Sequence, residues 1–288
     1  MRSLTACFVL FTASGCIHLM ECTAHGGPTW HEVQSPHFEM KTNKSLEVAT
    51  KDIALLKKLH FVMRWLFDIE TDVDDPLTVI SVTNSADLYP FGIDAAGLAV
   101  TSGPRRFLVL SGDSMSSKRG ESAELYAHEL AHLASRNAMP LQPHWLSEGF
   151  AEYAGPTLFL AAATAKVGLM PKRAIEVAGV ASVEQLWAWS YDSMTDAQRG
   201  WFYFSAWAWV HYLFNNEAER FRGFIERTKE GGEVRQLFDH AFSAQWQAET
   251  KVKIDQYVRR ARTTRPRCEY RRLSWTSKHA SSLMPRCT

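Results

Sequence analysis

The sequence predicts an α+β fold, with strands and one long helix in the first half of the chain and a mainly helical second half. Apolar and polar residues alternate with the period of a strand over residues 37–41. Apolar residues then recur at helical spacing from Ser45 to Phe67, before a second strand pattern at residues 76–82. From residue 121 onward the apolar residues mostly follow the helical period. These patterns place a sheet ahead of a helical part.

The composition is that of a globular chain with one or two domains. Its 288 residues are 46% hydrophobic and carry a formal net charge of +1, which is enough apolar material to bury a core. A near-neutral charge argues against nucleic acid as the main partner. No internal stretch of the sequence approaches the ~20 apolar residues that a membrane-spanning helix needs.

The amino terminus has the pattern of an export signal. Arg2 supplies a positive charge, Leu4 to Ala13 form a short apolar segment, and small residues precede Cys16. This arrangement resembles a bacterial lipoprotein signal, in which residues 1–15 are removed and Cys16 carries a lipid anchor. Residues 16–29 are then a tether between a membrane and the folded part.

An ordinary secretory signal is the alternative, because alanine rather than leucine lies three residues before Cys16. Cleavage would then fall between Cys22 and His25. Both interpretations predict export: the first to the cell envelope, on the periplasmic side and anchored to a membrane, and the second as a secreted protein. An exported compartment permits disulfides, and Cys268 with Cys287 is the natural pair.

Residues 30–115 are expected to form an amino-terminal part that carries the sheet. Within it, residues 97–101 and 106–110 are candidate strands of a hairpin, because a turn-forming sequence, Ser102-Gly103-Pro104-Arg105, joins them. If residues 97–101 lie at the edge of the sheet, their unpaired backbone groups can hold an extended peptide. An ordinary core hairpin is the other interpretation.

Residues 116–258 are expected to form one unit with this part. The predicted elements are a helix over residues 121–135, a helix that begins near His144, an apolar run from Leu158 to Ala163, an aromatic helix over 201–213, and amphipathic helices over 217–228 and 234–257. Residues 259–288 form a basic tail. Its arginines either contact anionic lipid headgroups or cell-envelope polymers, or remain solvated.

The segment Tyr126-Ala127-His128-Glu129-Leu130-Ala131-His132 has the spacing of a zinc site. Residues four apart lie on one helix face with Cβ atoms roughly 5–6 Å apart, so His128 and His132 can bind a single metal ion. A catalytic zinc takes three protein ligands and leaves the fourth position to water. Glu148, sixteen residues after His132, is the best third ligand, which gives a His₂Glu set.

Other side chains have predicted roles around this zinc ion. Glu129 lies about 100° round the helix from His128, beside the open metal position, where a carboxylate can act as general base. Glu152 follows Glu148 by one turn and can hydrogen-bond the distal nitrogen of a ligand histidine. His144 could approach the metal, although a surface or capping role is more typical of such a histidine.

The sequences HELAH (residues 128–132) and WLSEGFAEY (residues 145–153) resemble those of the gluzincin peptidases, the thermolysin-like and aminopeptidase-like metalloproteases. The WL-x-EG context is similar to that of peptidase MA-like proteins, which include a bacterial domain family of unknown function. One departure is that the interval to the glutamate is slightly shorter than in the best-studied gluzincins.

This resemblance implies a zincin fold of the thermolysin-like kind, with a mixed sheet over the active-site helix and an edge strand beside the cleft. It also implies roles for five side chains: His128, His132 and Glu148 as zinc ligands, Glu129 as base and acid, and Glu152 as the partner of a ligand histidine.

Related metalloproteases place a tyrosine or histidine from a downstream helix over the zinc, where it stabilises the negative oxygen. Tyr203 is the first candidate for this catalytic role, followed by His211 and Tyr153. Simple core packing is the alternative, because Tyr203, Trp207 and Val210 form one stripe at helical spacing.

The predicted function is zinc-dependent hydrolysis of peptide bonds in the cell envelope. Zn²⁺ is the predicted cofactor, and the predicted partners are a peptide or protein substrate and a membrane bound through the lipid anchor. Two alternatives remain: an inactive zinc-binding lipoprotein that holds a peptide or glycan in its cleft, and a purely structural zinc site. The second is disfavoured because structural zinc prefers four closed ligands, often cysteines.

Overall fold

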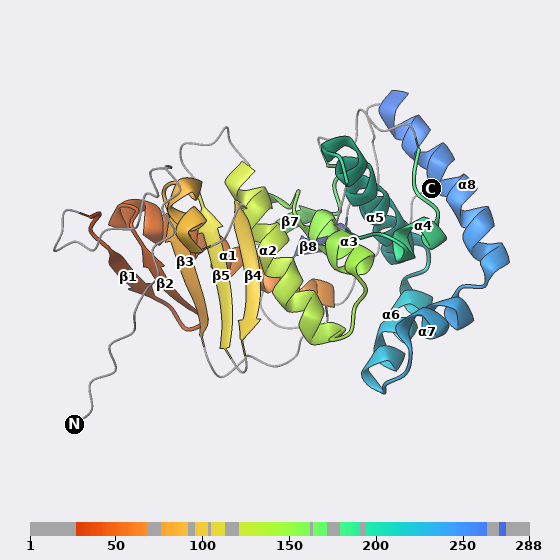
Figure 1. The fold of residues 1–288 in the computed structure, drawn as a ribbon, viewed down its shortest axis with the longest axis horizontal. Helices are drawn as coiled ribbons and strands as arrows, with labels where there is room; N and C mark the ends of the chain where they lie inside the picture. Colours follow the sequence, from red (N-terminus) through yellow and green to blue (C-terminus); the bar gives the residue numbers. More distant parts are fainter. Residues whose placement is uncertain are drawn as a thin grey trace, which may run out of the picture.

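The computed structural model describes residues 27–67, 76–91, 96–102, 105–112, 121–161, 164–171, 179–190, 194–263 and 271–274. Its fold is α+β, as the sequence predicts. A five-stranded mixed sheet lies at one end and most of the helices at the other, with helix α2 (Glu121–Ala138) between them (Figure 1).

The strands of the large sheet are β1 (His31–Gln34), β2 (Phe38–Thr42), β3 (Leu77–Val82), β4 (Gly97–Ser102) and β5 (Arg105–Ser111). Their order is β1-β2-β3-β5-β4. Strand β3 pairs in parallel with β2 and β5, whereas the edge strands β1 and β4 pair antiparallel with β2 and β5, respectively. Strands β4 and β5 form the predicted hairpin, and β4 is an edge strand of this sheet. Strand β1 was not predicted.

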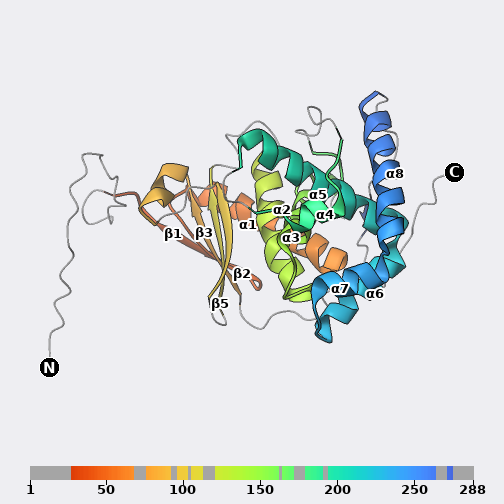
Figure 2. The same ribbon diagram turned by 45° about the vertical axis from the view of Figure 1, so that its right-hand side comes forward.

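Alternate side chains of β3 point to opposite faces of the sheet, as the period of a strand requires. Leu77 and Val79 join the main core beneath α1 (Leu46–Phe67) and α2, whereas Val82 packs in a small cluster with the 3-10 helix η2 (Ser85–Phe91). Figure 2 shows the sheet nearly edge-on, with α1 and α2 on one side of it. The sequence predicted α1 to within one residue.

A buried polar network fixes α2 against α1 and the end of β2. The Lys44 ammonium donates to Asp52 Oδ2 and to the Tyr126 hydroxyl, each at 2.9 Å. That hydroxyl donates to the same Asp52 oxygen at 2.7 Å. All three side chains are buried, so removing either Lys44 or Asp52 would leave the other charge without its ion-pair partner, which costs about 3–5 kcal/mol. The network holds the segment that leads, two residues later, to His128.

Helix α3 (His144–Ala154) packs between α2 and α5 (Asp196–Asn216). Gly149 permits the close contact with α5, since a Cβ atom there would lie 2.6 Å from Val210 Cγ2 and 2.8 Å from the Ala206 carbonyl oxygen. Packing against α5 therefore explains the glycine in the WLSEG sequence.

Helix α5 is the predicted aromatic helix, but it begins five residues earlier than predicted. Thr195 and Gln198 form a capping box, in which each side chain accepts a hydrogen bond from the backbone N–H of the other. A second capping box, Ser182 with Gln185, begins the short helix α4 (Val183–Trp187), which was not predicted. Both boxes are readable in the sequence as a hydroxyl residue followed three residues later by glutamine.

Helix α6 (Ala218–Lys229) lies where the sequence predicts it, but the single helix predicted over residues 234–257 is wrong. The structure has two helices there, α7 (Val234–Ala241) and α8 (Ala244–Thr263). Phe242 leaves the helical conformation, and the Ser243 hydroxyl caps α8 by accepting from the Trp246 N–H at 3.3 Å. Apolar residues continue across the break, which hides it from pattern analysis.

The basic tail predicted from residue 259 is also corrected in part. Helix α8 continues to Thr263, and β8 (Arg271–Ser274) pairs antiparallel with β7 (Thr164–Val167), which pairs with β6 (Leu158–Ala161). The predicted apolar run at 158–163 thus begins an unpredicted second sheet. Strand pairing uses backbone groups that every non-proline residue has, so the cluster of arginines gave no indication of it.

The predicted export signal, the lipidated Cys16 and the Cys268–Cys287 pair lie outside the described residues and stay predictions. Among the helices that are described, none combines the length and the apolar character needed to cross a membrane.

Candidate metal centre

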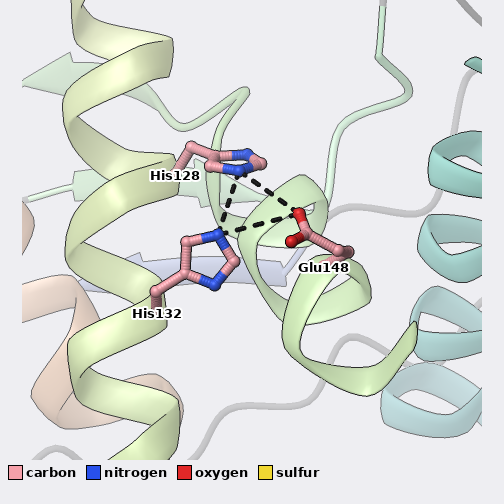
Figure 3. Close-up of side chains that lie close together, drawn as sticks. All are labelled: His128, His132 and Glu148. Atoms are coloured by element: carbon pink, nitrogen blue, oxygen red, sulfur yellow. Dashed lines mark hydrogen bonds and ion pairs between the residues drawn. The ribbon is translucent and has the colours of Figure 1, made fainter. Parts of the chain in front are cut away.

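Helices α2 and α3 bring the three predicted ligands together. The Nε2 atoms of His128 and His132 lie 3.2 Å apart. Glu148 Oε2 lies 3.5 Å from the first of these nitrogens and 3.7 Å from the second. Figure 3 shows the two rings on one face of α2 and the carboxylate reaching them from α3. Helical spacing explains the two histidines, and the packing of α3 on α2 explains the glutamate.

The spacing of these atoms fits a tetrahedral zinc ion. Zinc binds imidazole nitrogen and carboxylate oxygen at roughly 2.0–2.2 Å, which puts two ligand atoms of a tetrahedron about 3.3–3.6 Å apart. The separations of 3.2, 3.5 and 3.7 Å lie close to this range. Two imidazoles and a carboxylate are also a donor set that zinc accepts. The residues present can therefore hold zinc with little movement.

Each ligand histidine has a polar partner at its other ring nitrogen. His128 Nδ1 lies 3.3 Å from Glu152 Oε1, where the sequence predicts a carboxylate. His132 Nδ1 lies 3.0 Å from Ser147 Oγ, to which the Gln142 side-chain amide also donates at 3.4 Å. Such partners fix the tautomer and the ring orientation. Ser147 was not predicted, although its position directly before a ligand on α3 is a usable indication.

Replacing Glu152 by Gln is expected to weaken zinc binding by about 10- to 100-fold, the usual effect of losing a hydrogen-bonding partner of a metal ligand. The amide keeps the shape of the carboxylate, but its oxygen is a weaker acceptor for the His128 N–H. Competition with a chelator of known affinity measures the change. Ser147→Ala tests the other partner in the same way, because it removes the hydroxyl that lies against His132 Nδ1. An unchanged zinc affinity for Glu152→Gln would contradict the orienting role.

Glu129 lies beside the cluster and against the edge strand β4. Its side chain is buried and accepts a hydrogen bond from the Ala99 backbone N–H. Gly97 permits this approach, because a Cβ atom there would lie 2.7 Å from Glu129 Cγ and 3.0 Å from its Oε1. The edge strand therefore positions the carboxylate predicted to be the base. Residues 97–101 were predicted as a candidate edge strand beside the cleft, but their contact with Glu129 was not, since no local spacing reveals a contact between distant segments.

The two histidines differ in their affinity for protons when no metal is bound. Burial lowers the pKa of His128, but hydrogen bonds to Glu148 and Glu152 outweigh it and raise this pKa to about 10. Burial lowers the pKa of His132 to about 4, and the charge of His128 adds to that effect. Burial raises the pKa of Glu129 to about 7. One proton is therefore held on His128, at the position a metal would take.

Zinc binding near pH 8 is expected to release at least one proton per chain, because His128 must be neutral to coordinate and ionisation of a zinc-bound water adds to the count. With a pKa of about 10, His128 carries that proton at pH 8, whereas His132, with a pKa of about 4, is already neutral. Zinc affinity should consequently rise about tenfold per pH unit up to about pH 10. Titration calorimetry in two buffers of different ionisation enthalpy counts the protons, and a value of zero would contradict the assignment of His128.

A cavity of about 1000 Å³ opens over the cluster. Three elements supply most of its lining: α2 and α3 with the ligands, Glu129 and Glu152, and β4 with residues 97–99. The edge strand and the candidate metal site thus share one cavity, in which an extended chain of a few residues has room to lie.

Of the three candidates for the oxyanion role, Tyr203 lines the cavity, and Tyr153 and His211 are not among its described lining residues. Tyr203 contributes to its lining, and the Tyr203 ring packs edge-on against Trp189 with centroids 5.3 Å apart. Tyr153 and His211 are buried, with ring centroids 5.9 Å apart, and neither is among the described residues that line the cavity. His144 lines the cavity with its Nδ1 3.8 Å from Glu148 Oε1, outside the three-atom cluster.

No model of a known protein family matches the sequence, and a search of curated proteins finds no match either. The geometry of the metal centre and its cavity therefore carries the functional argument.

Proposed function

We propose that the chain is a zinc-dependent peptidase of the gluzincin type. The observation that carries the proposal is a triangle of His128, His132 and Glu148 donor atoms within one cavity that Glu129 also lines. Three protein ligands leave a position for water, as catalytic zinc requires. A structural zinc would instead be expected to have a fourth protein ligand, and the described cluster has three.

Each neighbouring side chain has a chemical task in this proposal. Bound zinc would polarise the scissile carbonyl and make water acidic enough to react near neutral pH. Glu129 takes a proton from the attacking water and returns it to the leaving amine. Its carboxyl group is buried and lines the cavity beside the metal position, within reach of a water bound there, as a general base must be. Tyr203 donates a hydrogen bond to the carbonyl oxygen as negative charge develops there.

The edge strand supports a peptide as the substrate. Leu98 and Ala99 of β4 line the cavity beside the candidate metal site. An edge strand offers backbone donors and acceptors to an extended chain, which gives affinity without requiring a particular sequence. This arrangement of an edge strand beside the metal helix also supports the thermolysin-like zincin fold, which is part of the proposal. The amino-terminal sequence supports cell-envelope export with a lipid anchor at Cys16.

The test is cleavage of a peptide library by the purified protein, with the products identified by mass spectrometry. Zinc-loaded protein is expected to cleave, chelation to abolish cleavage, and added zinc to restore it. Stoichiometric zinc binding without cleavage of any library peptide would reject the peptidase and leave an inactive zinc protein that binds a peptide or glycan. Failure to bind zinc would reject both.

A further inference from the structure

The charges along the cavity are arranged asymmetrically. Helix α2 contributes four side chains at intervals of four residues, and all of them line the cavity: Glu124, His128, His132 and Arg136. Glu124 thus lies one turn before the ligand pair and Arg136 one turn after it. Among the described lining residues, Arg136 is the only lysine or arginine.

The residues of helix α3 that line the cavity follow the same order from its basic end to its acidic end. His144 and Ser147 lie at its start and Gly155 follows its end, and all three line the cavity. His132, nearer the end of α2, contacts Ser147, whereas His128 contacts Glu152 one turn further along α3. The two helices are therefore antiparallel. One end of the cavity has Glu124 and Glu152, and the other has Arg136 with the start of α3.

The Arg136 guanidinium is exposed and makes no hydrogen bond or ion pair with any residue that the structure describes. Several other cations have carboxylate partners, including Lys44 with Asp52 and Lys251 with Asp255. A guanidinium stays charged at any physiological pH and has a planar fork of donors that matches a carboxylate. Arg136 is thus a permanent cation available at one end of the cavity.

We propose that Arg136 binds a carboxylate of the substrate on the carboxy-terminal side of the cleaved bond. Arg136 is about 6 Å beyond His132 along the helix, and an extended peptide advances about 3.3 Å per residue. The carboxylate therefore lies about one to three residues from the scissile bond. The opposite, acidic end of the cavity suits the amino-terminal direction of the same peptide. This inference rests on the proposed function and names its substrate class.

The carboxylate has two possible sources, the free carboxy terminus of a short peptide and the side chain of Asp or Glu. Arg136 also lies in the last turn of α2, where a cation stabilises the helix through its dipole without any ligand. An experiment must separate these three possibilities, and it must also separate Arg136 from zinc, because a carboxylate can bind the metal directly.

The test measures binding with the zinc-loaded Glu129→Gln protein, so that cleavage does not interfere. The probes are fluorescein-labelled hexapeptides of mixed sequence without Asp or Glu, made with a free carboxy terminus or as the amide. A third set is amidated and has Glu at one of its last three positions. Fluorescence anisotropy gives Kd for each set, with and without Arg136→Ala. Arg222→Ala is the matched control, since Arg222 is an exposed helical arginine outside the described cavity lining.

A carboxylate-containing set is expected to bind about 10-fold or more tightly than the plain amide. Adding Arg136→Ala should remove this preference, whereas Arg136→Lys should restore part of it and Arg222→Ala should leave it unchanged. The free-acid and Glu sets identify the source of the carboxylate. Equal zinc content in all variants excludes an effect through the metal.

The outcomes distinguish failure of this inference from failure of the proposed function. The role of Arg136 is overturned if carboxylate-containing peptides still bind more tightly than the plain amide, by the same ratio of Kd values, after Arg136→Ala. It is also overturned if no peptide set binds measurably. If the carboxylate preference depends on Arg136 but wild-type protein cleaves none of the peptides, the site binds carboxylates and the peptidase proposal fails. A changed unfolding midpoint with an unchanged ratio would assign Arg136 to the helix terminus alone.

Discussion

Replacing Glu129 by Gln is expected to lower kcat/KM for peptide cleavage by about 10²- to 10⁴-fold, the contribution of a positioned general base. Glutamine preserves the shape and can still meet the Ala99 N–H through its amide oxygen, but it cannot take a proton from water. Zinc content should stay at one per chain because Glu129 is outside the donor triangle of His128, His132 and Glu148. Steady-state kinetics and metal analysis on the same samples measure both quantities.

Glu124→Gln is the matched control for that substitution. Glu124 is another carboxylate on α2 that lines the same cavity, yet it has no proton-transfer role in the proposed mechanism. Its variant should therefore keep kcat within a few-fold of wild type, and any loss in kcat/KM should come from KM, because Glu124 lies at the end of the cavity proposed for the amino-terminal part of the peptide. Near-native turnover by Glu129→Gln, or an equal loss in Glu124→Gln, would contradict the assignment of Glu129 as the base.

Replacing Glu148 by Ala is expected to remove zinc almost completely. The loss of zinc affinity should be well beyond the roughly 100-fold that follows from losing a hydrogen-bonding partner of a metal ligand. The change leaves only two imidazoles and deletes the anionic ligand. A bound metal stabilises the folded state by about 4 kcal/mol when it is present at 1,000 times its Kd. Added zinc should thus raise the unfolding temperature of wild type and leave that of Glu148→Ala unchanged.

Glu152→Gln is the control in that experiment, because Glu152 lies one turn further along α3 and contacts His128 instead of the metal position. It should still be stabilised by zinc, at a higher zinc concentration. If Glu148→Ala bound zinc as tightly as Glu152→Gln, the third ligand would have to be a different residue.

The metal cluster could be predicted because most of its geometry is local. The four-residue interval places His128 and His132 on one helix face without any knowledge of the fold. Glu148 and Glu152 are likewise related by one turn of α3. The contact between the two helices is not local, but the short connection through Pro140 and Pro143 restricts where α3 can lie relative to α2.

The parts of the site that depend on distant contacts could not be predicted. Gly97 and Ala99 meet Glu129 only because β4 lies at the sheet edge and packs on α2. The turn sequence at residues 102–105 predicts that β4 pairs with β5, but it gives no indication of the helix that packs on β4. The pairing of β8 with β7 was missed for the same reason, since arginine-rich residues 271–274 contribute through backbone groups.

The choice between Tyr203 and His211 illustrates the limit of helical periodicity. Eight residues separate them, which puts them about 80° apart around α5 and about 12 Å apart along its axis. Among the described residues that line the cavity, Tyr203 is the one that comes from α5. The angle around a helix is readable in a sequence, whereas the part of the helix that reaches a site is set by the packing of the whole domain.

Anomalous diffraction at the zinc absorption edge, from crystals of the zinc-loaded protein, tests directly whether His128, His132 and Glu148 bind a catalytic zinc. A catalytic zinc should give one strong peak within about 2.0–2.2 Å of His128 Nε2, His132 Nε2 and a Glu148 carboxylate oxygen. The fourth position should face the cavity beside Glu129, with no protein atom coordinated there. A peak elsewhere, or a fourth protein ligand closing the site, would contradict a catalytic zinc and with it the proposed peptidase.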